Sequence, residues 1–143
     1  MKTATQFLMA LIAVATFTFT GCKKDKDKEA DKTESIVGRW QFVKVETKQT
    51  YNGTTTNDTE NAPAGSFIEF KKDGSFSGKT EIDIVGTWKL SNNRVFFDGS
   101  GAYNLNADPD GHEIRKITAS ELVLFSDDKD GSFSSETTIY LKK

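Results

Sequence analysis

The chain contains little cysteine, proline or histidine: one Cys, two Pro and one His in 143 residues. A single cysteine excludes a disulfide framework and a zinc site built from cysteines, so the fold must be held by its apolar core. The 19 Lys and Arg against 21 Asp and Glu leave no basic field, which argues against a nucleic-acid partner. The length fits one domain with short appendages, which excludes a multidomain enzyme.

Residues 1–21 have the pattern of a signal peptide. Lys2 gives a short positive start, an apolar run follows over residues 7–15, and the residues up to Gly21 are smaller and more polar. The alternative is a membrane-spanning anchor, which needs about 20 predominantly apolar residues. The threonines on both sides of the apolar run favour the signal peptide.

The sequence Phe19-Thr20-Gly21-Cys22 resembles the lipobox of bacterial lipoproteins. Gly21 and Cys22 match that motif, whereas Phe19 and Thr20 stand where Leu and Ala or Ser are usual. The resemblance implies cleavage before Cys22, acylation of its thiol and a partner in the membrane, with the protein anchored in the outer membrane of a bacterial envelope. Two or three acyl chains, at about 0.8 kcal/mol per buried CH₂, would make that attachment almost irreversible.

Residues 22–35 form the predicted tether between the lipidated Cys22 and the domain. The segment KKDKDKEADKTE alternates lysine with acids and has no large apolar side chain, so it cannot bury enough surface to fold alone. An exposed charged helix is the alternative, but so short an isolated helix is marginal in water.

Residues 36–143 are predicted to form strands, because short β-branched and aromatic runs recur between Gly, Asn and Asp clusters. No helix is expected here. Short turns join the runs, which predicts an all-β fold: a single eight-stranded antiparallel up-and-down barrel, whose closure also removes exposed edges. The eight predicted strands are Gly38–Lys48, Ser66–Lys71, Ser75–Thr80, Ile82–Ser91, Arg94–Asp98, His112–Thr118, Glu121–Ser126 and Glu136–Lys142.

One connection is long. Residues 49–65 are polar, with Tyr51 as the only sizeable apolar side chain, and a loop of this length is usually a lid, a binding loop or disordered. An insertion without function is the equal alternative.

Two Gly-x-Trp motifs, Gly38-Arg39-Trp40 and Gly86-Thr87-Trp88, accompany this strand pattern. With the lipobox and the DGSF turn at residues 73–76, they make the chain similar to the small lipocalin-like lipoproteins of Bacteroidota. The resemblance covers residues 36–143 and implies that Trp40 closes one end of the barrel. Because the last predicted strand runs to the final residues, the helix that follows the barrel in typical lipocalins is not expected here, and the predicted domain is shorter than theirs.

An eight-stranded barrel is just wide enough to be filled by its own side chains or to hold one small ligand. The domain is rich in phenylalanine, so much of the interior could be self-filled. If a pocket opens at the barrel mouth, the candidate ligand contacts are Tyr51, Phe42, Phe70, Phe97 and Tyr103.

Catalytic patterns are lacking. The only histidine, His112, follows a Pro-Asp-Gly turn and is expected to be a solvated residue at a strand start. Residues 106–111 and 127–131 resemble the first half of a calcium loop, but Ile117 and Thr137 stand where a bidentate Glu is required. No metal site and no cofactor are therefore predicted.

Three function classes follow. The first is a non-enzymatic lipoprotein that binds a small hydrophobic molecule in the barrel mouth, as the lipocalin resemblance implies. The second is a protein-interaction module with a filled barrel, such as a protease inhibitor or an accessory subunit of an envelope complex. An envelope enzyme ranks third, because no nucleophile and base are paired in the sequence.

Overall fold

The computed structural model describes residues 31–100, 105 and 109–143. Within these residues the chain forms nine antiparallel strands, preceded by a short helix over residues 31–36. The strands are β1 (Gly38–Tyr51), β2 (Thr54–Asn61), β3 (Phe67–Phe70), β4 (Ser75–Lys79), β5 (Asp83–Ser91), β6 (Arg94–Ser100), β7 (His112–Ile117), β8 (Glu121–Asp130) and β9 (Phe133–Lys142). The predicted all-β fold is confirmed: eight strands close an antiparallel barrel, and one strand is additional.

The long strand β1 closes the barrel. Its first residues, Gly38–Gln41, pair with β3, and its other side pairs with β9 from Gln41 onward. From β3 to β9 each strand pairs with the next in the chain, which is the predicted up-and-down order. The additional strand, β2, pairs with the distal half of β1, beyond the point where β1 leaves β3.

The prediction of a loop over residues 49–65 was wrong for most of its length. Residues 49–51 complete β1, and residues 54–61 form β2. Two adjacent positive φ angles, 49° at Asn52 and 81° at Gly53, match the type I′ turn that a two-residue hairpin requires. Threonine, which is β-branched, favours the extended backbone even where both faces of the strand meet water. The polarity of the segment therefore reflected an exposed hairpin.

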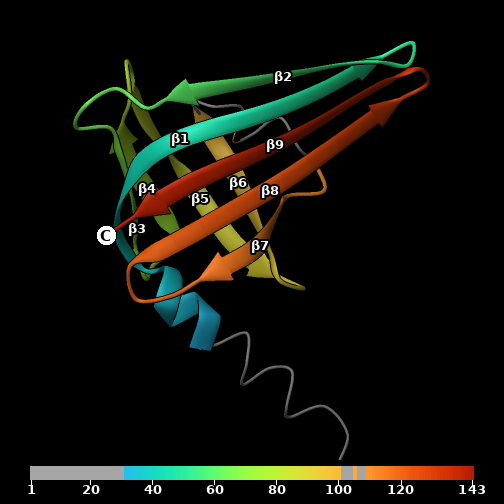
Figure 1. The fold of residues 1–143 in the computed structure, drawn as a ribbon. Helices are drawn as coiled ribbons and strands as arrows, with labels where there is room; N and C mark the ends of the chain where they lie inside the picture. The colour runs from blue at the N-terminus through green and yellow to red at the C-terminus, as the bar shows by residue number, and fades with distance from the viewer. Residues whose placement is uncertain (1–30, 101–104, 106–108) are drawn as a thin grey trace, which may run out of the picture.

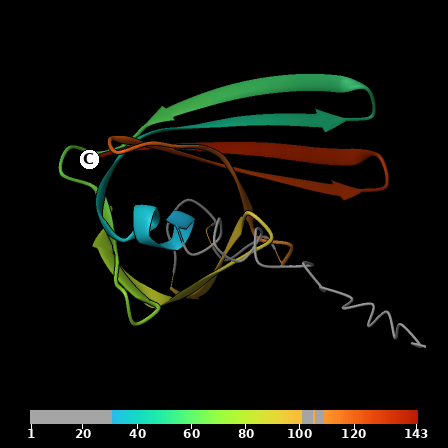
Figure 2. The same cartoon turned by 90° about the horizontal axis from the view of Figure 1, so that it is seen from below.

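Two long hairpins, β1–β2 and β8–β9, extend beyond the barrel and lie side by side (Figures 1 and 2). We call this four-stranded extension the projecting sheet; it consists of residues 44–51, 54–61, 126–130 and 133–138. The helix over residues 31–36 lies at the opposite end, in the middle of the ring of strands when the barrel is seen from below (Figure 2). The barrel thus has one end closed by the helix and one end continued by the projecting sheet.

A β-bulge at Val43 sets which face of β1 points inward. The pairing with β9 shifts register between Phe42 and Lys44. Before the bulge, Trp40 and Phe42 are buried, and after it the buried residue is Val45. Since side chains alternate along a strand, the extra residue moves the odd-numbered positions to the inner face from Val45 onward. The inner face of the projecting sheet therefore continues the barrel interior.

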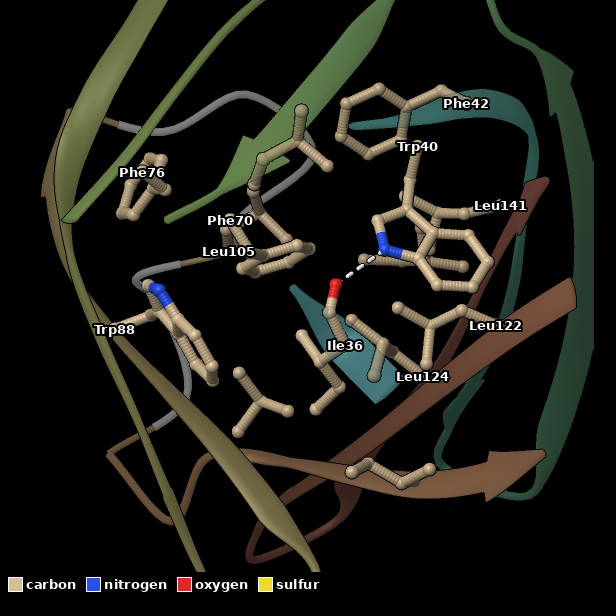
Figure 3. Close-up of a cluster of buried hydrophobic side chains, with 14 of the residues drawn as sticks. Ile36, Trp40, Phe42, Phe70, Phe76, Trp88, Leu105, Leu122, Leu124 and Leu141 are labelled. Carbon is tan, nitrogen blue, oxygen red and sulfur yellow. Dashed lines mark hydrogen bonds between the residues drawn. The ribbon is translucent and has the colours of Figure 1, made fainter. Parts of the chain in front are cut away.

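The barrel interior is filled by apolar side chains (Figure 3). Trp40 and Ile36 are fully buried at the closed end, and the Nε1 of Trp40 donates a hydrogen bond to the carbonyl of Ile36 (2.6 Å). Phe70 packs edge-on against Trp88 at a ring distance of 5.3 Å, and Leu105 is buried. The expectation that the aromatic side chains fill much of the barrel agrees with this arrangement.

The helix over residues 31–36 covers the last part of the predicted tether. It is attached to the barrel by a hydrogen bond from Lys32 Nζ to Asn93 Oδ1. At its other end, Lys143 Nζ donates to the carbonyls of Ser35 (3.4 Å) and Val37 (3.3 Å). In the described part of the chain no helix is long and apolar enough to cross a membrane.

Candidate functional site

The inner face of the projecting sheet carries a hollow of about 260 Å³ beside the barrel mouth. Val45, which belongs to the barrel core, is one of its lining residues. The rest of the lining is hydroxyl, amide and carboxylate groups: Thr47, Gln49, Thr56, Asp58, Glu60, Ser135 and Thr137. Such a surface offers hydrogen bonds and negative charge, with little apolar area.

Charge is divided between the two faces of the projecting sheet. The strand register places four acids on the inner face: Asp58 and Glu60 on β2, and Asp128 and Asp130 on β8. Within the four strand segments that form this sheet, no lysine or arginine shares that face. The inner face is therefore purely acidic, with one pair of carboxylates along each outer strand.

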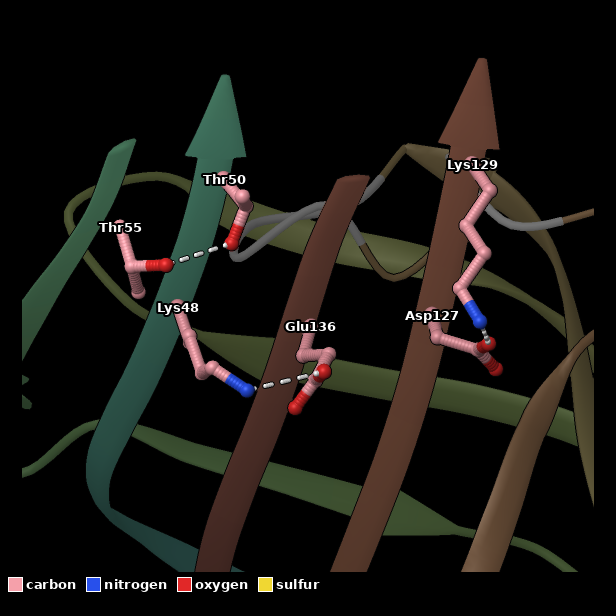
Figure 4. Close-up of polar contacts among 6 residues, drawn as sticks. All are labelled: Lys48, Thr50, Thr55, Asp127, Lys129 and Glu136. Carbon is pink, nitrogen blue, oxygen red and sulfur yellow. Dashed lines mark hydrogen bonds and ion pairs between the residues drawn. The ribbon is translucent and has the colours of Figure 1, made fainter. Parts of the chain in front are cut away.

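On the outer face of the projecting sheet, lysines and acids form ion pairs with one another. Its three lysines are each paired with an acid: Lys44 with Glu46 (2.5 Å), Lys48 with Glu136 (3.2 Å) and Lys129 with Asp127 (3.9 Å). Figure 4 shows the last two pairs together with the contact between the hydroxyls of Thr50 and Thr55 (3.0 Å). The cations of the sheet therefore do not neutralise the inner acids.

Glu46 is the centre of a polar cluster on the outer face. Hydrogen bonds from Lys44 and from the Tyr140 hydroxyl (2.7 Å) stabilise its carboxylate and hold its pKa below the ordinary value. The same contacts raise the pKa of Lys44, through its hydrogen bond to Glu46, and the pKa of Tyr140, for which the hydrogen bond to Glu46 is again the main cause. Near neutral pH the side chains of Lys44 and Glu46 are therefore charged, and the Tyr140 hydroxyl keeps its proton.

The residues predicted as ligand contacts do not form one site. Phe42 and Phe70 are buried in the core, and Phe97 packs against Phe70 and Phe76 at ring distances of 5.9 and 5.6 Å. Tyr51, 62% exposed, lies at the tip of the β1–β2 hairpin, in register with Phe133 of β9. Tyr103 lies outside the described residues, as does Cys22, the predicted lipidation site.

The tryptophans of the two Gly-x-Trp motifs each donate a hydrogen bond to a backbone carbonyl. Gly38 begins β1 with φ of 120°, and Trp40 donates to the carbonyl of Ile36. Trp88 similarly donates its Nε1 proton to the carbonyl of Lys71 (3.1 Å), in the β3–β4 turn. At Gly86 a Cβ atom would lie 2.2 Å from the Asp98 carbonyl oxygen, so only glycine permits this close approach of β5 and β6.

A family model described as "Lipocalin-like domain" matches residues 36–124, more than half of the chain. The chain belongs to the lipocalin-like family. The match begins at Ile36, whose carbonyl receives the Trp40 hydrogen bond, and ends within β8. No curated protein and no solved structure matches the chain. Lipocalin-like barrels are typically binding folds rather than enzymes, and they suggest the binding of a small molecule.

The lipocalin-like barrel buries its only histidine, so the expectation of a solvated His112 was wrong. His112 is 1% exposed, and its ring meets Phe97 at 5.5 Å. Its Nε2 lies 2.9 Å from the Leu105 carbonyl oxygen; because a carbonyl only accepts, Nε2 carries the proton. The cause is Leu105, which is buried in the barrel core and whose carbonyl accepts the Nε2 proton.

The acidic residues resembling a calcium loop at 127–131 belong instead to β8 and its turn. Asp127 lies on the outer face with Lys129, and Asp128 lies on the inner face. Among the described residues no group of three or more His, Cys, Asp or Glu could hold a metal ion.

Sequence reasoning missed the acidic inner face, including Asp58 and Glu60 on β2. The signal was present in the sequence as Asn52-Gly53 between threonine-rich segments, a strong indication of a hairpin. Once that turn fixes the register, Asp58 lies opposite Thr47 and Glu60 opposite Val45, both on the inner face.

Proposed function

We propose that this protein is a lipid-anchored, non-enzymatic interaction module of a bacterial envelope, of the kind found in Bacteroidota. Cys22 carries the lipid in the outer membrane. The barrel acts as a rigid scaffold, and the projecting sheet binds a partner protein of the envelope.

The filled barrel supports this proposal most directly. Lipocalins that carry an apolar molecule need an interior space, whereas here Trp40, Phe70 and Phe76 are at most 2% exposed and occupy that space. Burial of one such side chain stabilises the fold by about 1.5–3 kcal/mol. A ligand could enter the interior only if several of these side chains were displaced, and the fold would lose the burial free energy of each. The extended surface that remains is the projecting sheet.

Photo-crosslinking in living cells tests the proposal. A photoreactive residue is introduced at Thr56 or Gln49, which lie on the projecting sheet, and at Lys72, which lies in the turn at the closed end. The proposal predicts a discrete crosslinked protein from the sheet positions and none from Lys72. Equal crosslinking from all three positions, or none from the sheet, would contradict it.

The lipocalin-like family and the hollow beside Val45 favour a second candidate, the binding of a small molecule. The polar lining of about 260 Å³ would suit a compact polar molecule with hydrogen-bond donors better than the small hydrophobic ligand predicted from the sequence. Native mass spectrometry of protein purified without refolding distinguishes these alternatives. A stoichiometric adduct that is lost in the Asp58→Asn variant would support binding of a polar molecule in the hollow. An apolar adduct that can be extracted would show that the barrel opens.

A further inference from the structure

Among the described residues, the projecting sheet has two edges that no further strand covers, and these edges differ in charge. One edge is β2, which pairs only with β1 among the described strands and whose residues are all exposed (Figure 1). The other edge is the end of β8 beyond Phe125, where the pairing with β7 stops. Exposed edges invite the addition of further strands, and natural proteins commonly block them with charged side chains.

The β8 edge is blocked in this way, and the β2 edge is not. Four of the five residues from Ser126 to Asp130 are charged. By contrast β2, TTTNDTEN, has two charged residues, no lysine, no proline and no register shift against β1. Its threonines favour the extended conformation. β2 is thus the edge that can accept another strand.

The hairpin turn fixes which backbone groups of β2 are available. In a two-residue hairpin the flanking pair, here Tyr51 and Thr54, exchanges hydrogen bonds, and bonded and non-bonded pairs then alternate. The hydrogen bond from the Ala62 amide to the Val43 carbonyl (3.0 Å) agrees with this alternation. The N–H and C=O groups of the remaining β2 positions therefore point away from β1; these positions are Thr55, Asn57, Thr59 and Asn61. The Thr59 amide already donates to Asp58 Oδ1 (2.9 Å), so an added strand would use the amides of the other three positions.

Charge defines the chemistry of the strand that fits this edge. Asp58 and Glu60 are two residues apart on the inner face, whereas the outward-facing β2 side chains are neutral. Neighbouring strands place directly opposed side chains on the same face, so an added strand needs cationic residues at alternate positions to meet these acids. A second copy of β2 would bring its own acids to that face. The complementary occupant is therefore a basic strand.

We propose that the open edge of β2 binds an extended segment of a partner protein as an added strand, with Lys or Arg at alternate positions facing Asp58 and Glu60. This inference rests on the proposed function, since it names the kind of partner and the way it docks. The other inner-face acids, Asp128 and Asp130, add to the field that attracts such a segment.

A labelled nine-residue peptide tests the proposal. It has lysine at alternate positions with valine and threonine between them, and its control has the same composition with the lysines contiguous. Fluorescence anisotropy with the full chain in mild detergent should show tighter binding of the alternating peptide. Amide exchange should slow at Thr55 and Asn57, whose N–H groups would join the new ladder. Equal affinity for the two peptides, or absence of binding, overturns the proposal.

Two kinds of variant separate the backbone from the charges. Asn57→Pro removes an outward N–H that β1 does not use, and proline is tolerated on an edge strand. It should weaken peptide binding about tenfold or more, because a ladder hydrogen bond is lost and the ring obstructs the incoming strand. The matched control, Asp127→Pro, makes the same change on the β8 edge and should leave the affinity unchanged.

The exposed double variant Asp58→Asn, Glu60→Gln keeps the backbone edge intact. It should weaken binding of the lysine peptide about three- to tenfold at low salt, with a smaller effect at high salt. Binding that responds to the charges but not to Asn57→Pro would overturn strand addition. Self-association of the full chain that Asn57→Pro abolishes would also overturn the proposal, because the occupant would then be a second copy.

Crosslinking separates failure of this inference from failure of the proposed function. If a partner is crosslinked at Thr56 and is still crosslinked in the Asn57→Pro variant, the proposed interaction function stands and docking as an added strand is refuted. A partner captured in the parent chain and lost in Asn57→Pro, but retained in Asp127→Pro, would support both. Absence of a partner at every sheet position would refute the proposed function itself.

Discussion

Replacement of Trp40 by phenylalanine tests how the closed end of the barrel is held. The helix over residues 31–36 ends with carbonyl groups that have no partner within the helix. The Trp40 indole supplies a donor to one of them, at Ile36, in a fully buried environment. Leaving that carbonyl without a donor should cost about 1–3 kcal/mol of unfolding free energy. The smaller ring also leaves a void of about 40 Å³, which adds about 1 kcal/mol.

The expected loss for Trp40→Phe is thus about 2–4 kcal/mol, measured by urea unfolding of the chain from Lys23 onward. Trp88→Phe is the matched control, because the carbonyl it leaves, at the exposed turn residue Lys71, still accepts a hydrogen bond from the Gly74 amide (3.1 Å). Its loss should be about 1–2 kcal/mol. Amide exchange at Val37, which donates to Thr33 (3.3 Å), should accelerate only in Trp40→Phe. Equal losses for the two variants would refute this explanation of the closed end.

Three further predictions concern the barrel, its surface and its anchor. Gly86→Ala should destabilise the fold by about 1–3 kcal/mol or more, since the new Cβ would lie 2.8 Å from Phe76 Cε1 as well as against backbone; an unchanged thermal midpoint would contradict it. The pKa of Glu46 is lowered in the folded state, so its contribution to stability is present above the ordinary carboxyl pKa and disappears as the pH falls through the lowered folded value. Tyr140→Phe removes one hydrogen bond and should raise the pKa of Glu46 in a carboxyl NMR titration; an unmoved titration would argue against that bond. Cys22→Ala should release the protein from the membrane fraction, and retention there would point to an uncleaved apolar anchor.

The barrel was predictable because its sequence signals are local and mutually consistent. Each of the eight predicted strands overlaps a strand of the structure, since apolar alternation and turn residues such as Asp73-Gly74 mark both ends. The two Gly-x-Trp motifs indicated the family for the same reason. In each motif a glycine meets a backbone demand, a positive φ at Gly38 or a close strand approach at Gly86, and a buried tryptophan follows two residues later.

The projecting sheet was harder to predict because both of its faces meet water. Apolar alternation then disappears, and only turn chemistry and β-branched side chains remain as signals, as in residues 49–61. The division of charge was beyond sequence reasoning for another reason. It depends on the bulge at Val43, which decides that the face carrying Thr47 and Asp58, rather than the face carrying Lys44 and Lys48, continues the barrel interior.

The position of the helix under the barrel has a consequence for how far the protein reaches. An anchor at Cys22 would be separated from the helix by a segment whose fully extended length is about 30 Å. From Gly38 to Tyr51, β1 measures about 43 Å along the strand, counted at the usual spacing per strand residue. The helix lies at the end of the barrel opposite the hairpin tips. On a lipid anchor, the tips would therefore reach several tens of ångströms above the bilayer. A partner embedded in the same membrane would need an equally tall domain, whereas a soluble protein or one fixed to the next layer would meet the tips directly.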